Sequence, residues 1–426
     1  MRRRQRSGPA PDTPVETTIE RLGGRGDGVA RLYEGELYVP FTLPGERVRA
    51  RLGAPRGDGW AGRLDAVLQA APERATPACR HFTRCGGCAL QHLGSAAYAD
   101  FKRDLIVSAL ARRGLVAGSV LATRISPPGS RRRASFAAQR GPRGCAVGFH
   151  AAGSTRLVPL VECPVAQPAI VALLPALAAC LADCLPPGGT ADVLVTALDG
   201  ALDVAIDSAT VPGLAAREAL AGFAAERDLA RLTWSGEPIA LRRAVRARFA
   251  GIAVALPPGG FLQATAEGEH AILEAVGAAS PSRGKVADLF AGCGTLSLPL
   301  AARGLAVHAV ERDEAACAAL DEAARAARLP VVAVARDLDR QPLAGHELDA
   351  LAAVVFDPPR AGAAAQAAAL AASTVPTVIA VSCHPGSFAR DARSLVDGGY
   401  RLDTVQPIDQ FLWSPHVELV AVFRRP

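Results

Sequence analysis

The sequence predicts a multidomain protein with a small all-β barrel, a central α+β domain and a C-terminal α/β domain. Short alternating runs separated by Gly and Pro predict the barrel, and a loop-rich cysteine segment follows them. From Gly284 onward, apolar strands alternate with alanine-rich helices, a pattern typical of an open, largely parallel sheet. The predicted segments are a disordered basic tail at 1–13, the barrel at 14–70, the central domain at 71–260, with a helix at 95–115 that packs on the last domain, and the C-terminal domain at 261–426.

Composition limits the function classes. The chain has 426 residues and a net charge of +6. Lys and Arg outnumber Asp and Glu by 25 to 12 in residues 1–150, so the first third suits the phosphates of a nucleic acid. A GC-rich genome explains the preference for Arg but not this asymmetry. Because no apolar run of about 18 residues exists and the N-terminus lacks the apolar part of a signal peptide, we expect a cytoplasmic protein without a membrane partner.

A glycine turn marks a candidate nucleotide pocket. A strand at 286–290 enters this turn, where Gly292 and Gly294 let the backbone approach a ligand closely. The next strand ends in Glu311, which is placed to accept hydrogen bonds from both hydroxyls of a ribose, and Asp337 follows a third strand. The spacing fits S-adenosylmethionine. A purely structural glycine turn in another doubly wound protein is the alternative.

Three further residues lie at the ends of strands of the same sheet. Asp357 follows a buried strand that two prolines terminate. Cys383 follows the next strand and precedes a helix, where helix-end amides and nearby Arg are expected to lower the pKa of a thiol. Glu418 lies in a last strand that returns to the sheet, and a carboxylate beside a thiol can act as a general base. Taken alone, each has a structural interpretation, as a turn, a core cysteine or an exposed strand residue.

Together these motifs resemble the RNA uracil-5-methyltransferases, specifically the members that bind an iron–sulfur cluster and modify 23S ribosomal RNA. The resemblance covers nearly all the chain from about residue 14. It implies a Rossmann-like domain that binds S-adenosyl-L-methionine and methylates C5 of a specific uridine in 23S rRNA. The matching motifs are Asp288 to Thr295, Asp357 to Gly362, Ser382 to Pro385 with Ala389 to Asp391, and His416 to Glu418.

The resemblance also implies residue roles. Cys383 would add to C6 of the uracil, and Glu418 would remove the C5 proton. Asp357 would hold the uracil edge or the methyl donor. The predicted cofactor-binding set is Gln263, Phe290, Thr295, Glu311, Asp337 and Asp357. The chain departs from the family at Ala291 and Thr295, where Cys and Asn are usual, at His384, where Asn is usual, and at 411–415.

The clustered cysteines predict a metal centre. Cys79, Cys85 and Cys88 lie close together in the sequence, and Cys163 precedes Pro164. Four thiolates suit either zinc or a [4Fe–4S] cluster, and unligated cysteines are a further alternative. The single Cys-x-x-Cys pair argues against a zinc ribbon. The pattern resembles the cluster of the family, which we expect to organise the RNA-facing surface without taking part in the reaction.

The barrel resembles the TRAM (OB-like) RNA-binding module, so we expect RNA, most of all ribosomal RNA, as the partner of a monomeric protein. A second candidate RNA patch is Arg131 to Arg133 beside Phe136. Three alternatives stay open: a tRNA uridine-54 C5-methyltransferase, whose members typically lack the cysteines and the barrel, a non-catalytic RNA-binding protein on this scaffold, and a redox enzyme. The candidate phosphate contacts of the barrel are Arg21, Arg25, Arg31, Arg47, Arg49 and Arg51.

Overall fold

The computed structural model describes residues 12–32 and 35–425. The chain divides into two compact units: unit 1 is Met1–Phe101 with Trp413–Pro415, and unit 2 is Lys102–Leu412 with His416–Pro426. The tail predicted to be disordered lies, except for residues 12 and 13, outside the described residues. This division falls inside helix α1 (Ser95–Ala111). It does not test the predicted domain boundaries, which stay a prediction.

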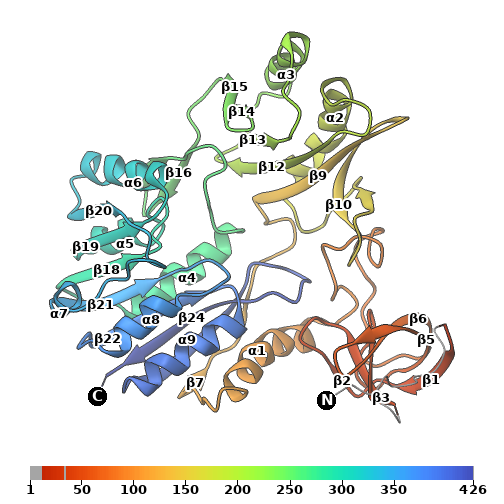
Figure 1. The fold of residues 1–426 in the computed structure, drawn as a ribbon, viewed down its shortest axis with the longest axis horizontal. Helices are drawn as coiled ribbons and strands as arrows, with labels where there is room; N and C mark the ends of the chain where they lie inside the picture. The colour runs from red at the N-terminus through yellow and green to blue at the C-terminus, as the bar shows by residue number, and fades with distance from the viewer. Residues whose placement is uncertain (1–11, 33–34, 426) are drawn as a thin grey trace, which may run out of the picture. The chain divides into compact units, whose positions relative to one another are not determined.

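Unit 1 begins with a six-stranded sheet (Figure 1, red to orange). In strand β5, Val48 and Ala50 are buried whereas Arg47 and Arg49 are exposed, as the two-residue period of a strand requires. β4 pairs with β6 in parallel, whereas the other neighbouring strands of this sheet pair antiparallel. In sheet order the strands are β1 (Pro14–Thr18), β5 (Arg47–Arg56), β6 (Gly59–Gln69), β4 (Gly35–Val39), β3 (Gly28–Leu32) and β2 (Arg21–Leu22).

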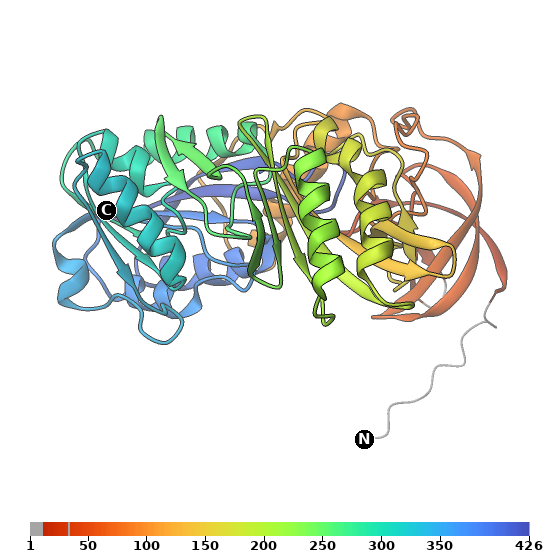
Figure 2. The ribbon, with the colours of Figure 1, turned by 90° about the horizontal axis from the view of Figure 1, so that it is seen from above.

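The first part of unit 2 is a seven-stranded sheet covered by two helices. α2 (Pro168–Cys184) packs against α3 (Leu214–Glu226), and the two lie side by side in Figure 2 (yellow and green). Pro168 opens α2 at a position where its missing N–H costs no helical hydrogen bond. In sheet order the strands are β11 (Leu157–Pro159), β10 (Gly144–His150), β9 (Arg133–Gly141), β12 (Thr190–Leu198), β13 (Ala201–Asp207), β14 (Arg231–Trp234) and β15 (Glu237–Leu241).

A nine-stranded sheet forms the second part of unit 2. Its first five strands run parallel, and β24 then pairs antiparallel with β22. In sheet order the strands are β20 (Val331–Ala335), β19 (Ala306–Glu311), β18 (Lys285–Leu289), β21 (Leu351–Phe356), β22 (Thr377–Ser382), β24 (Glu418–Arg424), β23 (Arg401–Asp409) and β7 (Ser119–Val120), with β8 (Arg124–Ile125) also paired to β23. The sequence did not predict β7 and β8, which are only two residues long. A separate two-stranded sheet contains β16 (Arg246–Phe249) and β17 (Ile252–Ala255).

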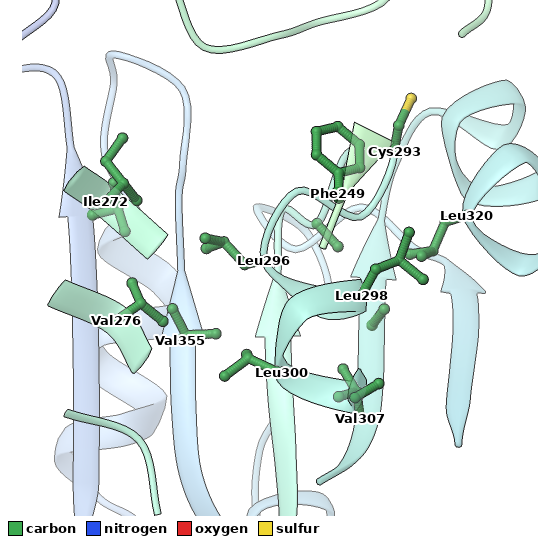
Figure 3. Packing of buried hydrophobic residues seen from close by; sticks show 14 of the residues in the cluster. Phe249, Ile272, Val276, Cys293, Leu296, Leu298, Leu300, Val307, Leu320 and Val355 are labelled. Carbon is green, nitrogen blue, oxygen red and sulfur yellow. The ribbon is translucent and has the colours of Figure 1, made fainter. Parts of the chain in front are cut away.

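Both faces of the nine-stranded sheet are buried, with helices on each (Figure 1). Along β21, Val355 joins one hydrophobic cluster and Val354 the other, so alternate residues serve opposite faces. Figure 3 shows the first cluster, in which Val355 lies near Val276 of α4 and Leu300 of α5. The remaining helices of this part are α4 (Ala266–Ala279), α5 (Ser297–Ala302), α6 (Glu314–Ala326), α7 (His346–Asp349), α8 (Ala364–Ala371) and α9 (Pro385–Asp397).

A buried ion pair fixes the end of β23. Lys102 and Asp409 are both fully buried, and Lys102 Nζ lies 2.8 Å from Asp409 Oδ1. Lys102 also donates to the backbone carbonyls of Phe411, at 3.3 Å, and of His416. The lysine therefore contacts both ends of the segment that connects β23 to β24.

We predict that Lys102→Met destabilises the protein by about 3–5 kcal/mol, because it leaves the Asp409 carboxylate buried without its cation. The double variant Lys102→Met/Asp409→Leu should recover part of this loss, since it removes both charges. Urea unfolding followed by tryptophan fluorescence measures the difference. Lys285→Met is the matched control, because Lys285 is exposed. Equal stability of the Lys102 and Lys285 variants would contradict the prediction.

Candidate active site

One cavity of about 580 Å³ lies at the carboxyl ends of the parallel strands in unit 2. This is the edge at which ligands bind in open α/β sheets. β24 runs in the opposite direction, so its first residue, Glu418, reaches the same edge. The sequence also predicted Thr295 as a cofactor-binding residue, but Thr295 is not among the residues that line this cavity. The predicted residues that line the cavity are Gln263, Phe290, Glu311, Asp337, Asp357, Cys383 and Glu418.

The turn after β18 adopts a backbone that few residues tolerate. Phe290, Gly292 and Gly294 all have positive φ angles, of 61°, 54° and 93°. At Gly294 a Cβ atom would lie 2.4 Å from Leu320 Cδ1, so both the conformation and the close packing of α6 require glycine there. Phe290 carries a side chain in this region of φ, which is a local strain at the wall of the cavity.

Glu311 and Asp337 follow neighbouring strands and line the same cavity. The Glu311 carboxylate accepts the N–H of Gly292 at 2.9 Å, and its other oxygen accepts the N–H groups of Arg312 and Asp313. The acid thus ties the glycine turn to the end of β19. A ribose at this position would share the carboxylate with these amides.

Burial and neighbouring charges shift the pKa values of the acidic groups and the thiol. Burial raises the pKa of Asp357 to about 6, against the opposing effect of its hydrogen bond with Gln263. Burial and then the charge of Asp357 raise the pKa of Glu418 well above its usual value. Burial, followed by the charges of Glu418 and Asp357, raises the pKa of the Cys383 thiol to about 11. The expected lowering of the thiol pKa is therefore wrong, because Arg360 acts in that direction but has the smaller effect.

A chain of hydrogen bonds joins the two carboxylates, and sequence reasoning missed its central member, Gln410. Gln263 donates to Asp357 Oδ2 at 2.8 Å. Gln410 donates to Gln263 Oε1 at 2.6 Å and to Glu418 Oε2 at 2.9 Å. In the sequence, Gln410 can be noticed as an amide directly after a strand end, in the segment that leads to Glu418.

The second predicted RNA patch is only partly on the surface of the cavity. Arg132 is paired with Glu269 at 2.6 Å and both are largely buried, so this arginine is structural. Phe136 is buried and stacks on Phe149 with ring centroids 5.0 Å apart, so the expectation that it belongs to the patch is wrong. β9 starts at Arg133 and its period of two sends Phe136 inward. Arg131 and Arg133 line the cavity.

The predicted metal-binding cysteines are divided between the units: Cys79, Cys85 and Cys88 belong to unit 1 and Cys163 to unit 2. The backbone N–H of His81 donates to Cys79 Sγ and that of Gly87 to Cys85 Sγ, each at 3.4 Å. Over residues 12–32 and 35–425, no group of three or more His, Cys, Asp or Glu side chains is arranged to hold a metal ion. The metal centre stays a prediction.

No protein-family model matches the sequence. Curated relatives do match over almost the whole chain. An RNA methyltransferase of uncharacterised specificity from Mesorhizobium japonicum is 45% identical over 412 residues, which cover 96% of this chain and 98% of the relative. The chain belongs to the RNA methyltransferase family. A second such relative, from Brucella suis, is 45% identical over 415 residues, covering 96% of this chain and 98% of the relative.

Two further similarities bear on this RNA methyltransferase. A 23S rRNA (uracil(1939)-C(5))-methyltransferase of Chromohalobacter salexigens is 35% identical over 427 residues, covering 96% of the chain and 89% of that relative. The crystal structure of a tRNA (uracil-54, C5)-methyltransferase of Pyrococcus abyssi, in complex with S-adenosyl-L-homocysteine, matches with a TM-score of 0.74. It covers 96% of this chain and 100% of that chain at 21% identity, so it shows that the fold is shared. No helix within the described part of the RNA methyltransferase is long and apolar enough to cross a membrane.

We predict that alkylation of Cys383 in this RNA methyltransferase, without ligands, becomes roughly tenfold faster for each pH unit from about 7 to about 9. The thiolate is the reacting form, and a pKa of about 11 keeps it a small fraction throughout that range. Timed iodoacetamide treatment with mass spectrometry of the Cys383 peptide measures the rate, and free glutathione corrects for the reagent. A rate that levels off near neutral pH would instead indicate a low-pKa thiol.

Proposed function

We propose that this RNA methyltransferase transfers a methyl group from S-adenosyl-L-methionine to C5 of a uridine in 23S rRNA, with Cys383 as nucleophile and Glu418 as base. The observation that carries the proposal is that a thiol, a buried carboxylate and the Glu311 strand end line one cavity. The named activity of the Chromohalobacter relative supports the choice of substrate.

The wall formed by the glycine turn suits the methyl donor. Glu311 offers carboxylate oxygens at a strand end, where a ribose would find acceptors, and Phe290 and Asp337 line the same cavity. Gln263 and Asp357 line the cavity together with Cys383 and are hydrogen-bonded to each other. Bound there, S-adenosylmethionine supplies the methyl group. Thr295 has no place in this proposal, since it does not line the cavity.

The chemistry requires a nucleophile and a base at the same ring. C5 of uracil is a weak nucleophile until the thiolate of Cys383 adds to C6, which forms an S–C6 bond and moves the electron pair of the C5=C6 double bond into an enolate. C5 then takes the methyl carbon and the bond from that carbon to the donor breaks. Glu418 removes the remaining C5 proton, the C5=C6 bond re-forms and the Cys383 thiolate leaves.

Glu418 is oriented for that last step. Its Oε2 accepts a hydrogen bond from Gln410, while Oε1 is buried and has no hydrogen-bond partner among the described residues. Oε1 therefore keeps lone pairs that can accept a proton once the carboxyl group meets a bound base. Its raised pKa brings a carboxylate closer to the neutral range in which a general base is most effective.

Arginines and aromatic rings border the cavity in a way that suits an extruded nucleotide. The guanidinium of Arg133 lies 5.8 Å from the ring centroid of Phe261, which is 59% exposed, and that of Arg131 lies 6.0 Å from Phe411. Burial and the charge of Arg131 lower the pKa of Arg133, so an anion beside them would be favoured. Exposed rings stack on unpaired bases and guanidinium groups bind phosphates.

We propose that the sheet of unit 1 is a TRAM-like RNA-binding barrel. Of its six candidate arginines, Arg25 and Arg31 are exposed and form no ion pair within the described residues. The other four are paired with acids of the same sheet: Arg21 with Glu36, Arg47 and Arg49 with Glu16, and Arg51 with Asp12 and Asp65. Such exposed pairs contribute little stability, so RNA phosphates can replace the carboxylates at small cost.

We propose that Cys79, Cys85, Cys88 and Cys163 hold a [4Fe–4S] cluster. The donor chemistry fits, since four thiolates suit such a cluster and the amides of His81 and Gly87 already donate to two of the sulfurs. The arrangement of these side chains in the described part of the chain does not by itself form a metal site. No step of the proposed reaction involves the cluster.

We predict that Cys383→Ala abolishes both methyl transfer and the covalent complex with RNA, whereas Glu418→Gln forms the complex but releases product at least about a hundredfold more slowly. Methyl-labelled donor and 23S rRNA from a strain lacking the protein are the substrates, and denaturing gels separate free RNA from the protein–RNA complex. Unmodified tRNA is the contrasting substrate. Methylation of 23S rRNA at an undiminished rate by Cys383→Ala would contradict the mechanism, and methylation of tRNA alone would contradict the substrate.

We predict that anaerobically purified protein contains about four iron and four sulfide ions per chain and absorbs visible light as iron–sulfur proteins do. Cys88→Ser should lose most of the iron, while Cys145→Ser, a change at a half-buried cysteine in β10, should keep it. Metal analysis and absorption spectra measure both. Zinc in place of iron, or equal iron in the two variants, would overturn the cluster.

A further inference from the structure

We propose that Gln410 is a positioning residue that holds the general base Glu418 in the orientation needed to release the covalent complex. The inference rests on the proposed function. Gln410 is 2% exposed and lines the cavity beside Cys383 and Glu418. It was not among the residues that the sequence motifs singled out.

Three hydrogen bonds fix which way the Gln410 amide faces. The backbone N–H of Ala264 donates to Gln410 Oε1 at 2.8 Å, and a backbone amide can only donate. Gln410 Nε2 must therefore face Gln263 Oε1 and Glu418 Oε2, and it donates one hydrogen to each of them. Because Gln263 accepts through Oε1, its own Nε2 is left to donate to Asp357. Reversing any one amide would break the chain.

This arrangement determines what Glu418 can do. An N–H donor on Oε2 favours the ionised carboxylate, against burial and the nearby charge of Asp357, which favour the protonated form. The same bond keeps Oε1 as the oxygen without a partner in the described structure. Loss of the amide would leave the backbone N–H of Leu419 as the remaining donor, would loosen the orientation of the carboxyl group and would raise the pKa of Glu418 further. Both changes remove the base from the step that needs it, whereas the thiol that forms the complex stays in place.

The backbone that carries Gln410 is fixed independently. Its neighbour Asp409 is paired with Lys102, which also contacts the carbonyls of Phe411 and His416. Glu418 begins β24 and pairs with Ile408 of β23. Gln410 and Glu418 therefore lie on two adjacent strand ends whose spacing is set by the sheet, and the side chain of Gln410 bridges them.

Gln410→Leu tests the inference, because leucine fills similar space and makes none of the three hydrogen bonds. Gln366→Leu is the matched control, since Gln366 is also buried, exchanges two hydrogen bonds with the backbone of Leu343 and does not line the cavity. Single-turnover reactions with methyl-labelled donor and 23S rRNA measure formation of the methylated protein–RNA complex and its release separately.

We expect Gln410→Leu to form the complex within about twofold of the wild-type rate and to release it roughly tenfold or more slowly, with the release rate rising at higher pH than in the wild type. Gln366→Leu should change neither step. Release by Gln410→Leu at the wild-type rate, or equal slowing of both steps, would overturn the inference. Gln410→Asn, which keeps the amide but withdraws it by about 1.5 Å, should also slow release and guards against a folding defect.

The outcomes separate this inference from the function on which it rests. If Glu418→Gln traps the complex and Gln410→Leu does not, the function stands and the positioning role is wrong. If Cys383→Ala still methylates RNA, or Glu418→Gln traps nothing, the proposed function itself fails.

Discussion

A parallel sheet that is covered on both faces leaves its strands no room for polar side chains except at their ends. This constraint holds along β21, β22 and β24, because alternate residues of these strands are divided between two hydrophobic clusters. Asp357 and Cys383 each follow such a strand directly, and Glu418 starts one that runs the opposite way. Burial of the strands thus brings the acid, the thiol and the base to one edge, although up to 61 positions of sequence separate them.

Concentrating these groups has an electrostatic consequence. Asp357, Glu418 and Cys383 each favour a proton more than they would in water, because burial penalises their charged forms and the charge of Asp357 further opposes ionisation of Glu418 and Cys383. The two glutamines between the carboxylates are neutral, so each donates to one carboxylate oxygen without adding charge. The acids and the thiol of the cavity therefore retain protons at a higher pH than they would in water.

The sequence predicted which site residues lie at the ends of strands. It missed the features that depend on the direction in which a side chain points. The strand ends at Glu311, Asp357 and Cys383 follow from apolar runs and from the prolines and glycines that stop them. Burial of the cavity, which reverses the expected shift in the thiol pKa, depends on neighbours far away in the chain. So does the inward direction of Phe136, since a one-residue error in register exchanges the faces of a strand. The partners of Gln410 lie in two other segments, at residues 263–264 and at Glu418, so its position after a strand end did not by itself reveal its role.

The two lysines of the chain illustrate how composition and geometry interact. Every other basic residue is arginine, as a compositional bias would produce where either side chain serves. Lys102, however, directs one ammonium group at a carboxylate and at two carbonyls, those of Asp409, Phe411 and His416. A compact group with three donors in a tetrahedral arrangement suits three oxygens that surround it, whereas the planar guanidinium directs its donors outward in one plane. The strand ends that carry Gln410 and Glu418 thus depend on Lys102 for their position. The compositional bias alone would favour arginine at this site.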